Sequence, residues 1–312
     1  MESNVSIYTT LLTMESLDLL PENILPVFVF VTLTYCAILF FNITLMVSVA
    51  LNQKLYKPMY ILLFNMPIFD IMGASALFPQ LMSSILAQNR SITYSACAVQ
   101  AFMVHTYGTG ALLILTAMAY DRYVAICYPL KYHTLMSPNK LLIIIILVWT
   151  LACAFVGTLV ALNHRTEICS TKIVDTFCNN PSLMKLICGD VRLNNYIGLF
   201  LTIVVQGLSL LIVFFTYIQI LITCVLKRHS EAKSKALQTC GTHLVVLLFF
   251  EFNSVFAITA HRFDSISQHL RKALGVSVMI FPPFLNPLIY GLKTKELRQS
   301  IVLILHKKIS PK

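Results

Sequence analysis

Seven long apolar stretches are the feature that most limits what this chain can fold into. A transmembrane helix needs about 20 predominantly apolar residues, whereas the strands of a membrane barrel would show alternating segments of about 10 residues. The stretches cover residues 25–51, 58–86, 98–127, 140–162, 195–226, 236–260 and 272–292. Only 12% of the 312 residues are charged, against about a quarter in soluble domains. The sequence therefore predicts an all-α membrane protein, a seven-transmembrane helix bundle that forms one domain over residues 1–312.

Basic residues predict the orientation of this bundle. If the N-terminus lies outside the cell, 15 of the 23 Lys and Arg residues fall in cytoplasmic segments, as the positive-inside rule requires. Residues 1–24 are then extracellular, 25–292 form the bundle, and 293–312 form a short amphipathic helix and a cytoplasmic tail. The net charge of +10 would face anionic membrane lipid. Nucleic acid is not an expected partner, because the basic residues form no groove or stripe. The expected localisation is the plasma membrane.

The segments on the predicted outer side carry candidate sites for modification. Asn4 and Asn89 each begin an acceptor motif for N-glycosylation. Residues 1–22 contain four acidic residues and no Lys or Arg, so we expect no cleavable signal peptide. Four of the nine cysteines lie in outer segments, where the compartment is oxidising; they are Cys97, Cys169, Cys178 and Cys188. Four cysteines allow three pairings, and their positions alone leave all three open.

Few charged side chains interrupt the apolar stretches, although an unpaired charge inside a membrane is costly. They are Asp70, the adjacent Asp121 and Arg122, and Glu251. Taken alone, Asp121 and Arg122 are equally well explained as a local ion pair that anchors a helix at the membrane surface. Glu251 is the one charged residue in "LVVLLFFEFNSVFAITA" (244–260), and its burial needs an explanation.

Four blocks of sequence share their pattern with one protein family. The blocks are "MAYDRYVAICYPLKYH" (118–133), "KPMYILLFNMPIFDI" (57–71), "KSKALQTCGTHL" (233–244) and "PPFLNPLIYGLKTKELRQSI" (282–301). In these blocks, and in their order among seven spans, the chain resembles vertebrate odorant receptors, a branch of the rhodopsin-like G-protein-coupled receptors. The "AHRF" at 260–263 and the doubled Pro282-Pro283 are more similar to the fish-like class I branch.

The resemblance implies a receptor and not an enzyme. Such a receptor binds a small odorant between its helices and activates a stimulatory, olfactory-type heterotrimeric G protein, which raises cAMP. The residues that would form its activation switch are Asp121, Arg122, Tyr123, Tyr217, Asn286, Pro287 and Tyr290. Asp121 would hold Arg122 in the inactive state, and a buried ion pair suits a latch between two states. The two tyrosines Tyr217 and Tyr290 would lean toward Arg122 in the active state.

The family also implies local features of the bundle. Asn286-Pro287 fits a bent helix whose freed carbonyl is satisfied by a side chain or water, and a plain kink is the alternative. The implied disulfides join Cys97 to Cys178 and Cys169 to Cys188. The loop over residues 163–194 would then be a folded lid above the ligand, since loops of this length are usually functional or disordered.

The resemblance places the ligand between the third, fifth, sixth and seventh helices. The candidate contacts are His105, Gly108, Thr109, Leu112, Glu251, Ser254, Val255 and Arg262. The planar guanidinium of Arg262 suits a carboxylate, so we expect a polar or carboxylate-bearing, water-soluble odorant. Arg262 would otherwise reach out to water or pair with Asp264. His105 is equally explained as a satisfied structural residue, and Gly108 and Gly110 as sites of close helix packing.

Three positions depart from the family pattern. Phe41 precedes Asn42 where the family usually has a glycine, which would alter packing only. Ala111 stands where many relatives have a glutamate, and Glu251 stands where an aromatic residue is common. Three interpretations of Glu251 are open. It is protonated and hydrogen-bonded to a neighbouring helix, it joins Asp70 and Asn286 in a polar cluster that binds sodium, or it contacts the ligand as a counter-ion. Sodium is the one cofactor considered, and no other metal site is expected.

Two other classes of function are alternatives to an odorant receptor. One is a receptor for another small ligand, such as an amine, lipid or peptide. The other is a transporter or channel, which is disfavoured because the chain shows no inverted repeat and has few intramembrane charges. No spacing of His, Cys or Gly typical of an enzyme site occurs. The sequence predicts no oligomeric state.

Overall fold

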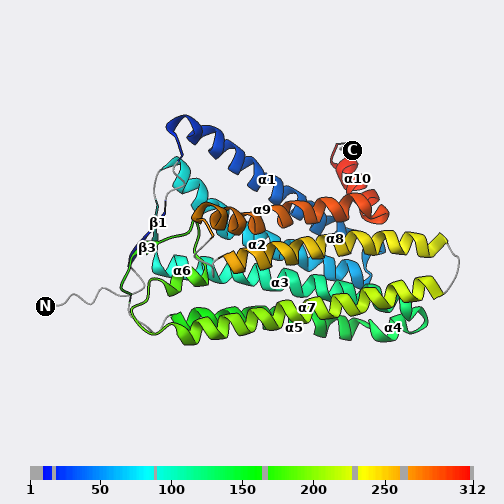
Figure 1. Ribbon diagram of the computed structural model, residues 1–312. Coiled ribbons are helices and arrows are strands. Elements are labelled where there is room, and N and C mark those ends of the chain that lie inside the picture. Colours follow the sequence, from blue (N-terminus) through cyan, green and yellow to red (C-terminus); the bar gives the residue numbers. More distant parts are fainter. Residues whose placement is uncertain are drawn as a thin grey trace.

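Seven helices of membrane length dominate the computed structural model, which describes residues 10–15, 19–87, 90–163, 168–226, 231–260 and 266–309. They lie alongside one another in a single bundle (Figure 1). The helices are α1 (Pro21–Leu51), α2 (Pro58–Leu86), α3 (Tyr94–Cys127), α5 (Pro138–Asn163), α7 (Arg192–Leu226), α8 (Glu231–Ala260) and α9 (Gln268–Lys293). All seven are long and apolar enough to cross a membrane. The predicted fold class is therefore confirmed.

Most of these helices begin earlier than the apolar stretches that predicted them. α3 and α9 begin before their apolar stretches because Thr93 and Ser267 cap their first turns. Each hydroxyl oxygen accepts a hydrogen bond from a backbone N–H. α1 begins at Pro21, a residue suited to the first helical turn. Hydropathy marks only the part of a helix that contacts lipid, so it misses polar first turns.

Smaller elements complete the two ends of the bundle. Three short helices and one longer helix are η2 (Gln53–Leu55), η3 (Pro129–Lys131), α4 (Tyr132–Leu135) and α10 (Lys295–Ile309). α10 is the predicted C-terminal helix, and it packs against α1 and α9. The hydroxyl of Ser300 in α10 donates to the Ser48 carbonyl of α1 at 3.2 Å. Leu297 of α10 is fully buried.

α3 runs through the centre of the bundle and packs against α2, α5, α7 and α8 (Figure 1). In its most apolar window 61% of residues are buried, compared with 17% for α5, so α5 presents most of its surface to lipid. Close packing depends on small residues. A Cβ added at Gly110 would collide with the ring of Phe69, which itself stacks on Trp149 with ring centroids 4.1 Å apart. Gly110 therefore serves close helix packing, which is the role that the sequence suggested for it.

α9 remains one helix although it contains Pro282, Pro283 and Pro287. A proline has no N–H, so it leaves the carbonyl four residues earlier without its helical partner. Two of the freed carbonyls find donors on other helices. The hydroxyl of Tyr107 in α3 donates to Val278 at 2.9 Å, and the side-chain amide of Asn42 in α1 donates to Pro283 at 2.8 Å. The bond from Asn42 is the side-chain partner that we expected for the carbonyl freed by Pro287.

A three-stranded sheet at one end of the bundle was not predicted. It consists of β1 (Leu11–Met14), β2 (Ser91–Thr93) and β3 (Lys172–Ile173) in the order β2-β1-β3. β1 is antiparallel to β2 and parallel to β3. We call the end of the bundle that carries this sheet the sheet end. Four- and two-residue strands carry too few alternating positions to stand out in a sequence.

The segment from 168 to 191, which we call the lid, covers the sheet end between α5 and α7. It contains α6 (Asn180–Met184) and is held by the two disulfides that the family implied, Cys97–Cys178 and Cys169–Cys188. A second apolar core lies beneath the sheet around the first of these bridges. Its buried members include Leu12, Ile92, Ile173 and Leu183. The candidate glycosylation sites Asn4 and Asn89 lie outside the described residues.

Substitution of Gly110 by alanine tests the packing of α3 on α2. The added methyl group meets Phe69, and overpacking of this kind costs about 1–3 kcal/mol. We expect a lower melting temperature of the detergent-purified protein and reduced surface expression. Gly157→Ala is the matched control, because no atom lies within 4 Å of a Cβ at Gly157 in α5. Equal melting temperatures for the two variants would contradict the proposed packing role.

Candidate functional site

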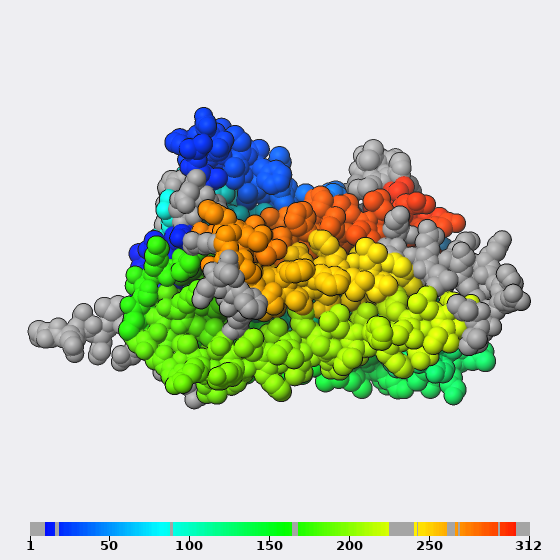
Figure 2. Space-filling model, in the orientation of Figure 1, coloured from blue at the N-terminus to red at the C-terminus, as the bar shows by residue number. Residues whose placement is uncertain are grey.

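A cavity of about 190 Å³ lies between α3, α5, α7, α8 and α9, directly beneath the lid. In the space-filling view α8 lies between α7 and α9 on the face toward the reader (Figure 2). The residues that line the cavity and carry polar side chains are His105, Tyr107, Thr109, Asn179, Asn180, Thr202, Gln206 and Ser254. The other lining residues are mostly apolar. Such a mixture suits a small molecule with a few polar groups.

Most of the predicted ligand contacts that the structure describes line this cavity. His105, Gly108, Thr109 and Leu112 of α3 do so, as does Ser254 of α8. Gly108 has no atom within 4 Å of an added Cβ, so it leaves space for a ligand and does not serve close packing.

Two predicted ligand contacts on α8 are not among the residues that line the cavity. Glu251 is buried but does not line the cavity. Val255 does not line it either, because 36% of its surface is exposed on the outside of the bundle. Arg262 lies outside the described residues.

Sequence reasoning missed the lining residues of the lid. Phe177, Asn179, Asn180 and Pro181 all face the cavity. A loop has no helical or strand periodicity, so its sequence does not indicate which side chains turn inward. The disulfide at Cys178 was the available signal, because it brings the neighbouring residues down onto α3.

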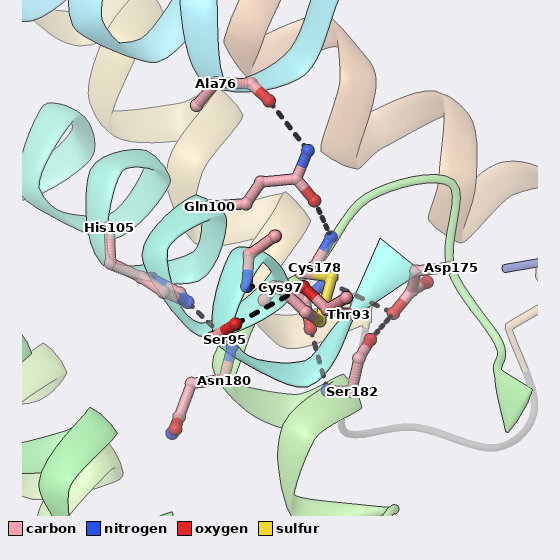
Figure 3. The surroundings of a disulfide bond; sticks show 12 residues. Ala76, Thr93, Ser95, Cys97, Gln100, His105, Asp175, Cys178, Asn180 and Ser182 are labelled. Carbon is pink, nitrogen blue, oxygen red and sulfur yellow. Dashed lines mark hydrogen bonds between the residues drawn. A yellow bond between two sulfur atoms is a disulfide. The ribbon is translucent and has the colours of Figure 1, made fainter. Parts of the chain in front are cut away.

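The lid is fixed to α3 by two side chains. The Nε2 atom of His105 accepts a hydrogen bond from the backbone N–H of Asn180 at 3.0 Å. One turn earlier, the side-chain oxygen of Gln100 accepts from the backbone N–H of Cys178 at 2.7 Å, and its amide nitrogen donates to the Ala76 carbonyl of α2 at 2.7 Å. Figure 3 shows this chain of contacts beside the disulfide. His105 is thus both a lining residue and a satisfied structural residue.

Three buried asparagines form a closed ring above the cavity. Asn163 at the end of α5 donates to the Asn180 side chain at 2.7 Å, and Asn180 in turn donates to Asn194 of α7 at 3.2 Å. Asn194 completes the ring by donating to the Asn163 side-chain oxygen. Each amide both gives and receives one bond within the ring. The ring therefore joins the lid to the ends of α5 and α7, and each of its three bonds has both a donor and an acceptor.

The floor of the cavity is polar but less completely paired. The Gln206 amide nitrogen of α7 donates to the Ser254 hydroxyl of α8 at 3.0 Å, and that hydroxyl donates to the Glu251 carbonyl at 2.9 Å. One turn further from the lid, Ser209 of α7 and Thr116 of α3 share a hydroxyl hydrogen bond of 2.6 Å. The Glu251 carboxyl lies beside Ser209.

Asp70 and Asn286 contact each other away from this floor. The Asn286 side-chain amide donates to the Asp70 carboxyl at 3.1 Å, and both residues are buried. No hydrogen bond joins Glu251 to either of them among the described residues. The structure therefore pairs Asp70 with Asn286, while the Glu251 carboxyl lies beside Ser209 of α7, and the predicted cluster of three stays a prediction. Binding of sodium stays a prediction.

Asp121 and Arg122 lie at the other end of the bundle, which we call the switch end. Arg122 donates from Nη2 to the Asp121 carboxylate at 2.6 Å, and the Tyr132 hydroxyl of α4 donates to the second Asp121 oxygen at 2.8 Å. Asp121 is fully buried. Burial and the Asp121 carboxylate raise the pKa of Tyr132, so this hydroxyl remains a donor at physiological pH.

The tyrosines of the predicted switch lie around this pair. The Tyr217 hydroxyl donates to the Cys240 carbonyl of α8 at 3.0 Å and contacts His243 Nδ1 at 2.9 Å. Tyr290 is buried in α9, and its hydroxyl has no hydrogen-bond partner in the described part of the chain. Tyr123 packs edge-on against Phe215 of α7. The structure therefore brings side chains from α3, α7, α8 and α9 to one end.

Comparison with known proteins gives consistent results. A family model described as olfactory receptor matches residues 31–308. Human olfactory receptor 52B2 is 33% identical over 271 residues, which cover 86% of this chain and 84% of that receptor. Human olfactory receptor 52P1 is 34% identical over 269 residues, covering 84% of this chain and 82% of that receptor. The crystal structure of squid rhodopsin matches with a TM-score of 0.70 at 15% identity, covering 94% of this chain and 88% of that one, which shows a shared fold.

Replacement of Asn180 by alanine tests the asparagine ring. It removes the acceptor of the Asn163 side-chain amide and the donor to the Asn194 side-chain oxygen, and each buried bond lost in this way costs about 1–3 kcal/mol. We expect a lower melting temperature of the purified protein, although the backbone bond to His105 can persist. Asn23→Ala, on the exposed first turn of α1, is the control. A melting temperature unchanged from that of the parent protein would show that the ring does not hold the lid.

Proposed function

The chain belongs to the olfactory receptor family, and we propose that it binds a small, polar, water-soluble odorant in the cavity beneath the lid. Occupancy would activate a stimulatory, olfactory-type heterotrimeric G protein and raise cAMP. Family membership makes the protein a G-protein-coupled receptor of the plasma membrane, with a small-molecule ligand and a G protein as partners, and not an enzyme. It also favours a receptor over a transporter or channel.

The observation that carries the proposal is the cavity itself. It is bounded by the helices on which the family places its ligand, and the lid closes it at the sheet end. Its polar lining supports a ligand that combines an apolar body with polar groups. The proposed orientation puts the N-terminus and the lid outside the cell, in agreement with the Lys and Arg distribution and with two disulfides at that end.

Signal transfer would run from the cavity along α8 to the switch end. Ser254 of α8 lines the cavity, and Cys240 of the same helix receives the Tyr217 bond close to Arg122. An outward movement of the switch end of α8 would break that bond and expose Arg122 to a G protein. The Asp121–Arg122 pair opposes the movement in the inactive state, because Asp121 holds Arg122 against α3.

Removal of the Tyr132 hydroxyl tests this latch. Tyr132→Phe deletes one of the hydrogen bonds to the buried Asp121 carboxylate, and bonds to charged groups contribute about 1.5–3 kcal/mol. We expect a several-fold rise in cAMP without ligand, measured in cells at matched surface expression. Tyr56→Phe is the control, since Tyr56 is exposed and its hydroxyl donates to the Ala50 carbonyl of α1, away from Asp121. Equal basal cAMP in both variants would argue against a latch role for Tyr132.

Recognition of a carboxylate would depend on Arg262, which follows the last residue of α8 by two positions in the sequence. Arg262→Ala removes the bidentate donor, so responses to carboxylic acid odorants should disappear while surface expression is kept. Dose–response curves for a series of short carboxylic acids measure the effect. Arg271→Ala in the first turn of α9 is the control. Unchanged potency of the acids in the Arg262 variant would rule out this role.

A further inference from the structure

Three buried oxygen atoms beneath the cavity floor have no hydrogen-bond partner among the described residues. They are both carboxyl oxygens of Glu251 and the side-chain oxygen of Gln206. Glu251 is only 2% exposed, and Gln206 lines the cavity. Buried polar atoms in folded proteins nearly always have partners. Three acceptors left together therefore indicate a group that is supplied from outside the chain.

The neighbouring hydroxyl groups have no hydrogen atoms left to donate. Ser254 gives its hydrogen to the Glu251 carbonyl, so it must accept from the Gln206 amide nitrogen, and the free Gln206 atom is its oxygen. Thr116 gives its hydrogen to the Leu112 carbonyl. Ser209 then supplies the hydrogen of the bond to Thr116. The hydroxyl groups of the site thus have no free hydrogen for the Glu251 carboxyl or the Gln206 oxygen.

No positive side chain is paired with Glu251 in the part of the chain that the structure describes. The described residues that line the cavity include no Lys, Arg, Asp or Glu. An ionised carboxylate without a partner at this depth is strongly disfavoured. The Tyr107 hydroxyl, another donor of the lining, is used by the Val278 carbonyl of α9. A cation with several hydrogen-bond donors would satisfy both the charge and the free acceptors.

We propose that Glu251, together with Gln206, forms a subsite for the protonated primary amine of a ligand at the cavity floor. This inference rests on the proposed function, since it names the ligand class of the same cavity. A primary ammonium group carries one positive charge and three N–H donors, as a lysine head does. It matches three free oxygens, two of which belong to the one carboxylate. A sodium ion would coordinate the same oxygens, and the replacement of sodium described below separates the two occupants.

Gln206 and Ser254 both line the cavity, and the Ser254 hydroxyl bonds to the Glu251 carbonyl beneath it. Glu251 precedes Ser254 by three residues on α8, so their side chains lie on neighbouring parts of one helix face. The ammonium group replaces the bond between Gln206 and Ser254 and places its charge against Glu251. Since the Ser254 bond joins α7 to α8, ligand entry would loosen the contact between these two helices at the floor.

The test compares ligands that differ only in the head group. A primary alkylamine, the alcohol and carboxylic acid of the same chain length, and the quaternary trimethylammonium analogue are applied to the full-length receptor. Binding is read as the rise in melting temperature of purified protein, and signalling as cAMP in cells. We expect the primary amine to stabilise and activate the receptor at lower concentration than the other three compounds.

Glu251→Gln keeps the shape of the side chain and removes its charge. We expect the amine to lose about tenfold or more in potency and in binding, because its charged partner is gone, while the alcohol changes by less than about threefold. Glu296→Gln is the matched control, on the exposed surface of α10. If Glu251→Gln fails to reach the surface, Glu251→Asp and Gln206→Leu are measured in its place, and both should weaken the amine selectively.

The remaining outcomes separate the amine subsite from the receptor function. An unchanged amine response in the Glu251 and Gln206 variants overturns the subsite. A wild-type receptor that responds to the acid or the alcohol and not to the amine overturns it too. Stabilisation by the amine without a cAMP response supports the subsite and contradicts the proposed signalling. Replacement of external sodium by choline should leave the amine effect unaltered. If binding at Glu251 instead follows the sodium concentration, the occupant is the ion and the proposal is wrong.

Discussion

A polar backbone group within a membrane helix needs a partner inside the protein, because lipid offers none. In α9 this constraint is acute, since three prolines remove backbone donors from one helix. Tyr107 and Asn42 supply replacements from α3 and α1. These bonds connect helices that are distant in the chain, and they fix the position of α9 along α3. The cavity wall formed by Val278 and Met279 is therefore positioned by the same contacts that make the prolines tolerable.

The two polar layers that border the cavity differ in how completely they are paired. On the lid side, Asn180 of the lid, Asn163 of α5 and Asn194 of α7 satisfy one another in a ring. At the floor, the oxygens of Glu251 and Gln206 have no donors in the described part of the chain. A satisfied network stabilises one arrangement, whereas an incompletely paired one gains stability when a ligand supplies the missing groups. The lid is thus suited to enclosing a ligand and the floor to responding to it.

The sequence predicted the features that depend on periodicity and composition. Seven spans and the C-terminal helix followed from apolar stretches. The positions of His105, Gly108, Thr109 and Leu112 on the cavity wall followed from helical spacing together with the family pattern. Features that depend on contacts between distant segments were missed. The sheet and the asparagine ring join short pieces whose own sequences carry no pattern.

Glu251 illustrates a different difficulty. Its carboxyl group was correctly recognised as exceptional, but its partners depend on the rotation of α8 about its own axis. A prediction of approximate helix limits does not fix that rotation. Glu251 turns toward Ser209 and not toward Asp70, while Val255 turns outward. The depth of a residue in the membrane was thus easier to derive than the side of the helix on which it lies.

The sheet also has a consequence for the order of assembly. β1 precedes the first helix, yet its parallel partner β3 follows α5, so Thr13 and Lys172 meet only after most of the first half of the chain exists. Contacts between distant segments form late, because the intervening chain must first be brought together. During synthesis β1 therefore cannot complete its sheet until α1, α2, α3 and α5 have been made. Closure of this sheet marks the point at which those four helices have come together.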